Sequence, residues 1–131
     1  MGGRTNYFPA VQVRDDLGVR PRNLEVLREA MLADVEDPDG TGTRAAVPGM
    51  RVSGKTGTAQ VKNAAGATVK DITWFISFAP YEKPRYAVVA MVEGGTSGAR
   101  VCAPIVQKIY TAIQARDRGG NGGAQTLAKA H

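Results

Sequence analysis

The stretch Pro48–Val61, PGMRVSGKTGTAQV, decides the fold because it fits two incompatible structures. In the first, Gly49-x-x-x-x-Gly54-Lys55-Thr56 is a loop after a strand, and a helix begins at the lysine. In the second, one strand runs through the lysine and the residues after it. Those residues, Gly57-Thr58-Ala59-Gln60-Val61, include a glycine and β-branched side chains, which form helices poorly. The sequence therefore favours the strand.

The residues around this stretch predict two further strands. Asp71–Ala79 alternates between two faces, and Arg85–Glu93 is apolar on both faces, which is typical of a covered central strand. The first strand is expected over Met50–Val61. The connections at Asn63–Gly66 and Pro80–Pro84 are too short for a parallel crossover, so they predict antiparallel hairpins.

Two helices are predicted on either side of the strands. The first runs from about Pro21 to Val35, since proline suits a first helical turn, and the second from about Ala99 to Arg116. We expect an α+β fold with an antiparallel sheet of about three strands flanked by helices. Residues 118–131 are expected to form a disordered tail, because they carry four glycines and little that is bulky and apolar.

The spacing of apolar residues predicts which side chains are buried. In the strand Asp71–Ala79, Trp74 and Phe78 are expected to lie in the core rather than in a functional site. The two helices are expected to bury stripes of residues that recur every three or four positions. These stripes are Leu24, Leu27, Met31 and Val35 in the first helix, and Val101, Ile105, Ile109 and Ile113 in the second.

Composition excludes several classes of site. The 131 residues carry a net charge of +5, but the basic residues are scattered, which argues against a nucleic-acid partner. The only histidine is the last residue, His131, so neither a Ser-His-Asp arrangement nor a zinc site is expected. The only cysteine, Cys102, lies in an apolar stretch and is predicted to be a small buried residue. We expect no metal, no cofactor and no membrane contact from this segment.

Lys55-Thr56-Gly57 also fits the K-T-G element of penicillin-recognising serine enzymes. Its surroundings resemble the C-terminal part of the transpeptidase domain of class B penicillin-binding proteins, and the resemblance covers about residues 1 to 115. The segments that carry it are Gly2–Pro9, Gly40–Thr43, Gly54–Gln60, Trp74–Pro80 and Tyr86–Glu93. It implies the C-terminal portion of such a domain over residues 1–117.

The resemblance implies a role for each residue of the K-T-G strand. Lys55 would supply positive charge for the substrate's carboxylate and for proton transfer. Thr56 and Thr58 would hydrogen-bond that carboxylate, and Gly57 would let the substrate lie against the strand. The backbone N–H of Thr58 would be one of two oxyanion-hole donors. The complete protein would act outside the inner membrane on peptidoglycan stem peptides, or bind β-lactams.

Two elements of the family are missing from this sequence. No serine stands in Ser-x-x-Lys or in Ser-x-Asn, so the chain alone is expected to be inactive and to be part of a domain truncated on its N-terminal side. The family's first strand would pair with Arg85–Glu93, so we also expect a homo-oligomer through that exposed edge. Two alternatives stay open: a non-catalytic binding module on the same scaffold, and a nucleotide binder of the phosphate-loop type.

Overall fold

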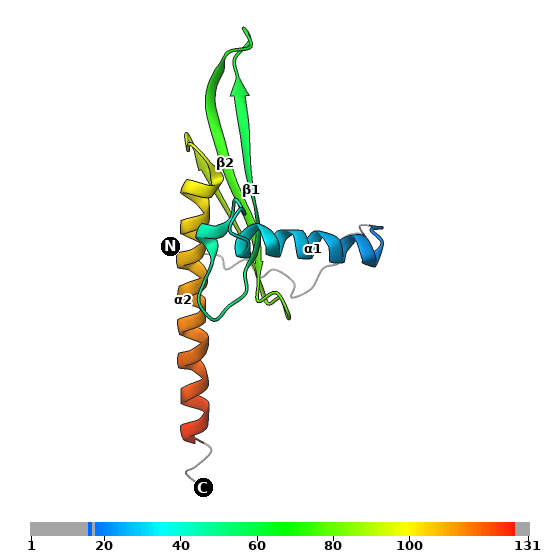
Figure 1. Ribbon diagram of the computed structural model, residues 1–131. Helices are drawn as coiled ribbons and strands as arrows, with labels where there is room; N and C mark the ends of the chain where they lie inside the picture. Colours follow the sequence, from blue (N-terminus) through cyan, green and yellow to red (C-terminus); the bar gives the residue numbers. More distant parts are fainter. Residues whose placement is uncertain (1–15, 17, 128–131) are drawn as a thin grey trace, which may run out of the picture.

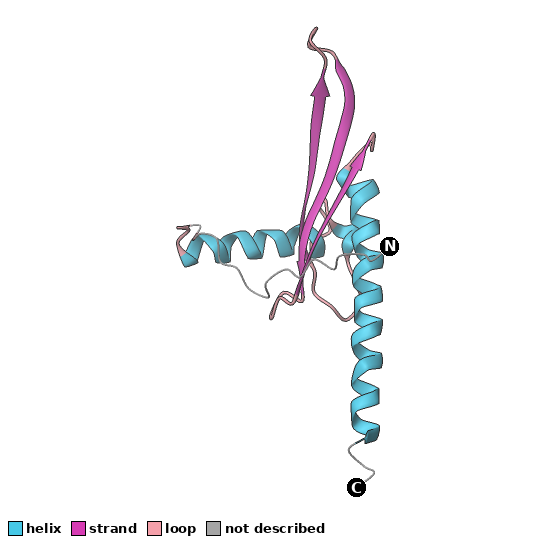
Figure 2. Ribbon diagram, turned by 180° about the vertical axis from the view of Figure 1, so that it is seen from behind, coloured by secondary structure: helices cyan, strands magenta, loops and turns pink. Residues whose placement is uncertain are grey.

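A computed structural model describes residue 16 and residues 18–127 of the chain. Within this part, a three-stranded antiparallel sheet lies between two α-helices, as Figure 1 and Figure 2 show from opposite sides. The expected α+β fold with an antiparallel sheet is confirmed. The elements in order are α1 (Pro21–Glu36), a 3-10 helix (Thr43–Ala45), β1 (Ser53–Lys62), β2 (Thr68–Ala79), β3 (Tyr86–Glu93) and α2 (Gly98–Leu127).

The sheet follows the order of the sequence, β1-β2-β3, so β2 is central and β1 and β3 are its edges. The β1–β2 turn is closed by Asn63, whose side chain accepts hydrogen bonds from the backbone N–H groups of Ala65 and Ala67. In the same turn Gly66 has a φ of 80°, a value that favours glycine. The prediction that β3 is a covered central strand is wrong, because β3 pairs only with β2 within the described residues.

The two faces of β2 are the reverse of what the apolar pattern predicts. Its buried face carries Thr73, Phe75, Ser77 and Ala79, all at most 6% exposed. Trp74 is 36% exposed, and Phe78 on the same face is only partly buried. Treating these two residues as core was therefore wrong for Trp74 and only partly right for Phe78.

Polar groups on the buried face are satisfied by α2 and β3, which explains the reversal. Ser77 donates its hydroxyl to the carbonyl of Val88 at 2.9 Å and lies 3.2 Å from the Tyr110 hydroxyl. Cys102 donates its thiol to the carbonyl of Thr73 at 3.4 Å. A hydroxyl with such partners costs little to bury, so serine and threonine can share this face with Phe75.

Helix α2 covers this face with a stripe one position away from the predicted one. Cys102, Val106 and Tyr110 are fully buried, whereas Ile105 and Ile109 are 41% and 38% exposed. The prediction that Cys102 is a small buried residue is confirmed. The helix continues to Leu127 where the sequence predicted a disordered tail from residue 118, and residues 128–131 lie outside the described part.

Helix α1 lies on the other side of the sheet, across its lower end in Figure 1. It begins with Pro21 in its first turn, and the N–H of Asp37 caps its end by donating to the carbonyl of Ala33. Only its last turns are packed: Leu32 and Val35 are buried, whereas Leu27 is 55% exposed. The predicted apolar stripe is therefore buried only at its C-terminal end, which is the end that meets β1.

Candidate functional site

Strand β1 carries all four residues predicted for the site. Lys55, Thr56, Gly57 and Thr58 pair consecutively with Ile76, Phe75, Trp74 and Thr73 of β2. The Lys55 and Thr58 side chains are exposed. Since β1 is an edge strand among the described residues, one side of this stretch has no strand beside it. Such an edge can pair with an extended peptide.

This geometry does not fit the phosphate-loop alternative. A phosphate-binding loop requires a helix that begins at Lys55, with its N-terminal N–H groups on the phosphates. In the structure Lys55 is the third residue of a strand that starts at Ser53. The last three residues of the loop pattern, Gly54, Lys55 and Thr56, therefore lie in an extended strand that pairs with β2.

A line of hydrogen bonds joins the strand to the end of α1. The Lys55 ammonium lies 3.3 Å from the Thr56 hydroxyl, which lies 2.7 Å from the hydroxyl of Thr41. Thr41 in turn donates to a carboxylate oxygen of Asp34 at 2.8 Å. The same carboxylate oxygen is 3.9 Å from the Lys55 ammonium. Asp34 thus connects α1, the following loop and the K-T-G strand.

Sequence reasoning missed Asp34, and it used Thr41 only as part of the resemblance. Asp34 precedes the buried Val35 near the end of α1, where an acidic residue is ordinarily solvated. Its role depends on the turn that follows, because the backbone N–H of Gly42 donates to the Asp34 carbonyl at 2.8 Å. That turn brings the Thr41 hydroxyl within hydrogen-bonding distance of the Asp34 carboxylate. No spacing rule in the sequence predicts the contact between residues 34, 41 and 56.

Helix α2 reaches the same strand at its first residue. A Cβ atom on Gly98 would lie 2.3 Å from the carbonyl oxygen of Trp74 and 3.1 Å from that of Gly57. Only a glycine fits such a close approach to backbone atoms. The start of α2 therefore lies directly on the middle of the K-T-G strand and limits its movement on that side.

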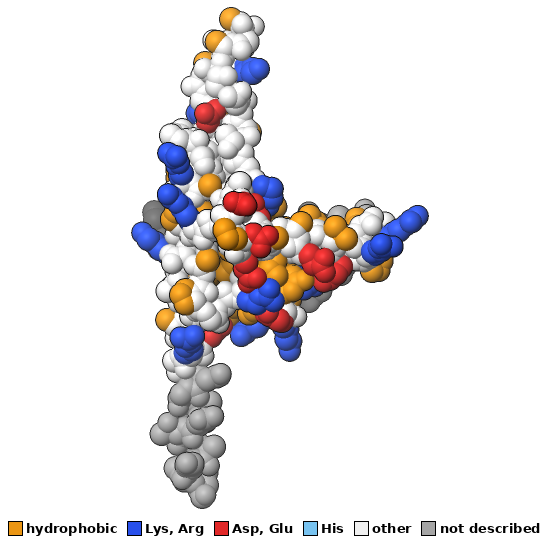
Figure 3. Space-filling model, in the orientation of Figure 1, with side chains coloured by type: hydrophobic (Ala, Val, Ile, Leu, Met, Phe, Trp, Pro, Cys, Tyr) orange, Lys and Arg blue, Asp and Glu red, His pale blue; other side chains and the backbone are white. Residues whose placement is uncertain are grey.

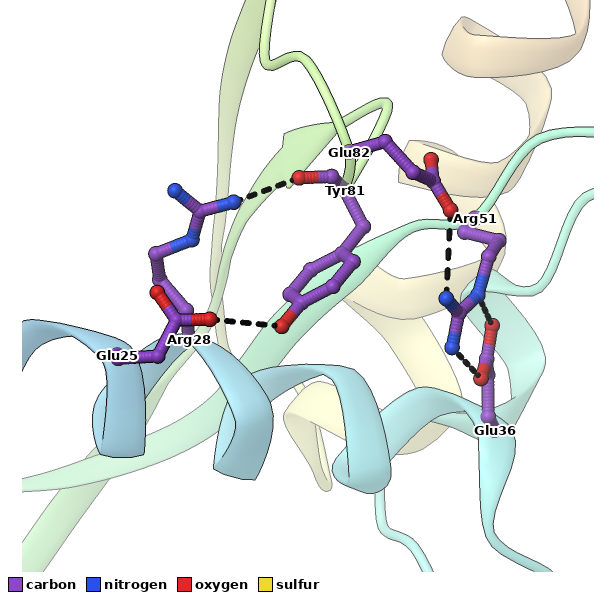
Figure 4. Close-up of polar contacts among 6 residues, drawn as sticks. All are labelled: Glu25, Arg28, Glu36, Arg51, Tyr81 and Glu82. Atoms are coloured by element: carbon purple, nitrogen blue, oxygen red, sulfur yellow. Dashed lines mark hydrogen bonds and ion pairs between the residues drawn. The ribbon is translucent and has the colours of Figure 1, made fainter.

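A second polar cluster fixes the end of α1 to the β2–β3 turn (Figure 4). Arg51 forms a two-point ion pair with Glu36 at 2.8 Å and reaches Glu82 at 3.3 Å. The Arg51 guanidinium holds the pKa of the Glu36 carboxyl below its ordinary value of 4.5. These contacts hold the turn of α1 that contains Asp34 close to the residues that lead into β1.

The other half of this cluster surrounds Tyr81. Arg28 donates to the Tyr81 carbonyl at 2.7 Å, and its guanidinium lies 5.1 Å from the centre of the Tyr81 ring. The Tyr81 hydroxyl donates to Glu25 at 3.2 Å. Burial, and then the charge of Glu25, raise the pKa of this hydroxyl. Figure 4 shows both halves of the cluster bridging α1 and the turn, so the helix and the sheet hold each other in place.

A groove of about 440 Å³ runs between α1 and the sheet beside Lys55. Apolar residues of α1 and Ile76 line one part of it, and Asp34, Asp37 and Asp39 line another. Figure 3 shows acidic side chains gathered where α1 meets the sheet. No group of three possible metal ligands occurs within the described residues. Nor does any helix there combine the length and apolar character needed to cross a bilayer.

Residues 10–111 match the family model of the penicillin-binding protein transpeptidase domain. The chain belongs to this family. It is 34% identical over 96 residues to the peptidoglycan D,D-transpeptidase MrdA of Haemophilus influenzae, covering 65% of the chain and 15% of that protein. It is 46% identical over 76 residues to the stage V sporulation protein D of Bacillus subtilis, covering 54% of the chain and 12% of that protein.

Solved structures agree with this assignment. The TP domain of Burkholderia pseudomallei penicillin-binding protein 3 superposes with a TM-score of 0.57 at 33% identity, over 67% of this chain and 28% of that one. The predicted resemblance to the transpeptidase domain of class B penicillin-binding proteins is therefore confirmed. The chain spans only about 15% of the length of MrdA and 12% of the sporulation protein, and about 28% of the Burkholderia domain.

Proposed function

We propose that this chain is the part of a peptidoglycan D,D-transpeptidase that holds the carboxylate of the stem peptide or of a β-lactam on the edge of β1. The observation that carries the proposal is the placement of Lys55–Thr58 in a strand that, among the described residues, has one side free of other strands. An exposed ammonium and an exposed hydroxyl there can bind a carboxylate, while the Thr58 N–H serves as an oxyanion-hole donor.

The proposal includes the setting of the complete protein. Its substrate would be the peptidoglycan stem peptide, its inhibitors would be β-lactams, and it would act on the extracytoplasmic side of the inner membrane. Membership of the transpeptidase family supports these assignments, because the relatives include proteins named peptidoglycan D,D-transpeptidases. Residues 1–117 would form the C-terminal portion of the catalytic domain.

Binding of a carboxylate peptide tests the role of the strand. Titration of the ¹⁵N-labelled chain with N-acetyl-D-alanyl-D-alanine should shift the amide signals of Lys55–Thr58, and Lys55→Ala should abolish the shift. Lys62→Ala is the matched control, since Lys62 is an exposed lysine at the other end of β1. The C-terminal amide of the same peptide should bind weakly. Equal binding by both variants, or by both peptides, would contradict the proposal.

The missing nucleophile gives a second test. The sequence contains neither Ser-x-x-Lys nor Ser-x-Asn, so it cannot form an acyl-enzyme by the family's chemistry. A fluorescent penicillin incubated with this chain should therefore be removed completely by denaturation. A covalent adduct on the denatured chain, located by mass spectrometry, would show that some other residue acts as nucleophile.

We further propose that β3 pairs with a second copy of the chain. Its outer edge has no strand partner within the described residues, and Val89 and Met91 are 62% and 47% exposed. Unprotected edges of this kind favour pairing between chains. Sedimentation equilibrium should show a dimer that Val89→Lys dissociates. A monomer at every concentration would refute this part of the proposal.

The second candidate, a non-catalytic binding module, is favoured by one specific observation. The strand that carries Lys55–Thr58 would be enough for reversible binding of a carboxylate, which needs no activated serine. Peptide binding alone does not separate the two functions. A binding module needs only reversible binding, whereas an enzyme also needs a nucleophile that becomes acylated. Addition of a separately prepared polypeptide with Ser-x-x-Lys and Ser-x-Asn should restore penicillin acylation if the chain is part of an enzyme, and should not if it is a binding module.

A further inference from the structure

Four side chains from three segments form one continuous line of hydrogen bonds. It runs from the Lys55 ammonium to the Thr56 hydroxyl, then to the Thr41 hydroxyl, and ends at Asp34. The separations along it are 3.3, 2.7 and 2.8 Å. The Asp34 side chain is only 13% exposed, so water competes little at that end.

The two ends of the line fix the direction of every hydrogen bond in it. A lysine ammonium only donates, and a carboxylate only accepts. Lys55 therefore donates to Thr56, and Thr41 donates to Asp34. Each hydroxyl has one proton, so the only arrangement that satisfies both ends has Thr56 donating to Thr41. The hydroxyl proton of Thr56 is therefore used in the hydrogen bond to Thr41.

The two threonines of the K-T-G strand are consequently not equivalent. Thr56 can donate to a ligand carboxylate only by breaking its bond to Thr41. Thr58 is exposed, and its side chain forms no hydrogen bond with the other residues that the structure describes. Its proton is free for a ligand, whereas Thr56 acts mainly by accepting from Lys55 and holding the ammonium at the strand.

We propose that Asp34 is a positioning residue that acts through Thr41. It keeps the Thr56 hydroxyl accepting from Lys55 and donating to Thr41, so that Thr58 is the hydroxyl that donates to the ligand carboxylate. This inference rests on the proposed carboxylate-binding function of the strand. Asp34 itself does not touch the ligand. Its removal frees Thr41 to donate to Thr56, or Thr56 to donate to the ligand, so the division of roles between the threonines is lost.

The test is a double-mutant cycle between residues 34 and 58, with binding of N-acetyl-D-alanyl-D-alanine as the readout. In the otherwise unchanged chain, Thr58→Val should weaken binding about tenfold, the size expected for a hydrogen bond to a charged group. In the Asp34→Ala background the same change should weaken binding by only about threefold, because Thr56 then substitutes as donor. An equal loss in both backgrounds would overturn the inference.

Two further variants separate positioning from a general loss of structure. Asp34→Asn keeps an oxygen acceptor for Thr41 and should retain the tenfold effect of Thr58→Val. Thr41→Val breaks the line while leaving the carboxylate in place, and should behave like Asp34→Ala even if the latter folds poorly. Asp37→Ala, which removes an exposed carboxylate from the same groove, is the matched control and should change nothing.

A readout without ligand distinguishes failure of this inference from failure of the proposed function. The methyl ¹³C and ¹H signals of Thr56 should move in Asp34→Ala and Thr41→Val but not in Asp37→Ala. If they move while no variant and no unchanged chain binds the peptide, Asp34 still positions Thr56 and the carboxylate-binding function is refuted. If they do not move, the inference is wrong whatever the peptide does.

Discussion

Replacement of Gly98 by alanine sets two effects of opposite sign against each other. Gly98 is the first residue of α2, and its φ lies outside the left-handed region, so alanine would not strain the backbone. Helix propensity alone would make Gly98→Ala more stable by up to about 1 kcal/mol. Its Cβ, however, would lie 2.3 Å from the Trp74 carbonyl oxygen and 3.1 Å from the Gly57 carbonyl oxygen.

The steric effect should win because the opposing atoms belong to the backbone of two paired strands. They cannot turn aside as a flexible side chain would, so α2 must move away from the sheet. Overpacking of this kind typically costs about 1–3 kcal/mol, which exceeds the gain in propensity. We expect Gly98→Ala to lose about 1–2 kcal/mol of the free energy of unfolding, or roughly 4 °C in melting temperature for each kcal/mol.

Gly119 provides a matched control in the same helix. A Cβ on Gly119 would have no atom within 4 Å, so Gly119→Ala should gain about 0.5–1 kcal/mol from propensity alone. Urea denaturation followed by circular dichroism measures both variants, with unchanged m-values as the check on two-state unfolding. A Gly98→Ala variant as stable as the unchanged chain, or a Gly119→Ala variant destabilised to the same extent as Gly98→Ala, would refute the steric explanation.

Three other substitutions test the core, one of its polar contacts and an exposed ion pair. Phe75→Ala removes a fully buried ring and should cost about 3–5 kcal/mol, measured by the same denaturation. Tyr110→Phe removes the hydroxyl that contacts Ser77 and should cost about 1 kcal/mol; no change would mean that the contact is not formed. The lowered pKa of Glu36 stabilises the fold above the ordinary value of 4.5, and this contribution is lost as the pH falls through the lowered pKa. At pH 7, Glu36→Gln should therefore lower the free energy of unfolding by no more than about 1 kcal/mol, since the pair with Arg51 is exposed. The difference from the unchanged chain should vanish in acid.

The sequence was sufficient to predict two helices and three antiparallel strands, but not the 3-10 helix Thr43–Ala45 or the C-terminal end of α2. Short connections rule out parallel neighbours, and the glycine and β-branched residues after Thr56 rule out a helix there. The choice of strand over loop-and-helix placed Lys55–Thr58 correctly in β1. Each of these predictions depended only on residues that are close together in the chain, through loop length or backbone propensity.

The sequence was insufficient wherever a feature depended on residues that are distant in the chain but adjacent in the fold. Alternation along β2 shows which residues share a face, but the face richer in large apolar side chains, with Trp74, Ile76 and Phe78, is not the one that is covered. The covered face is set by Tyr110 and Cys102, whose polar groups reach Ser77 and Thr73. The hydrogen bonds of Asp34 depend in the same way on the folded turn that carries Thr41. The spacing of residues in the sequence does not predict this turn.

The order of the strands also has a consequence for how the chain folds. Each strand pairs with its neighbour in sequence, so the sheet can form by two successive hairpin closures with short loops, which are rapid steps. The buried face, by contrast, is covered by α2, the last element. A nascent chain of which residues up to Glu93 have emerged from the ribosome would have all three strands in solution but no α2 over Phe75. During synthesis, the interval between release of β3 and release of Tyr110 is thus the period in which a chaperone would find this surface uncovered.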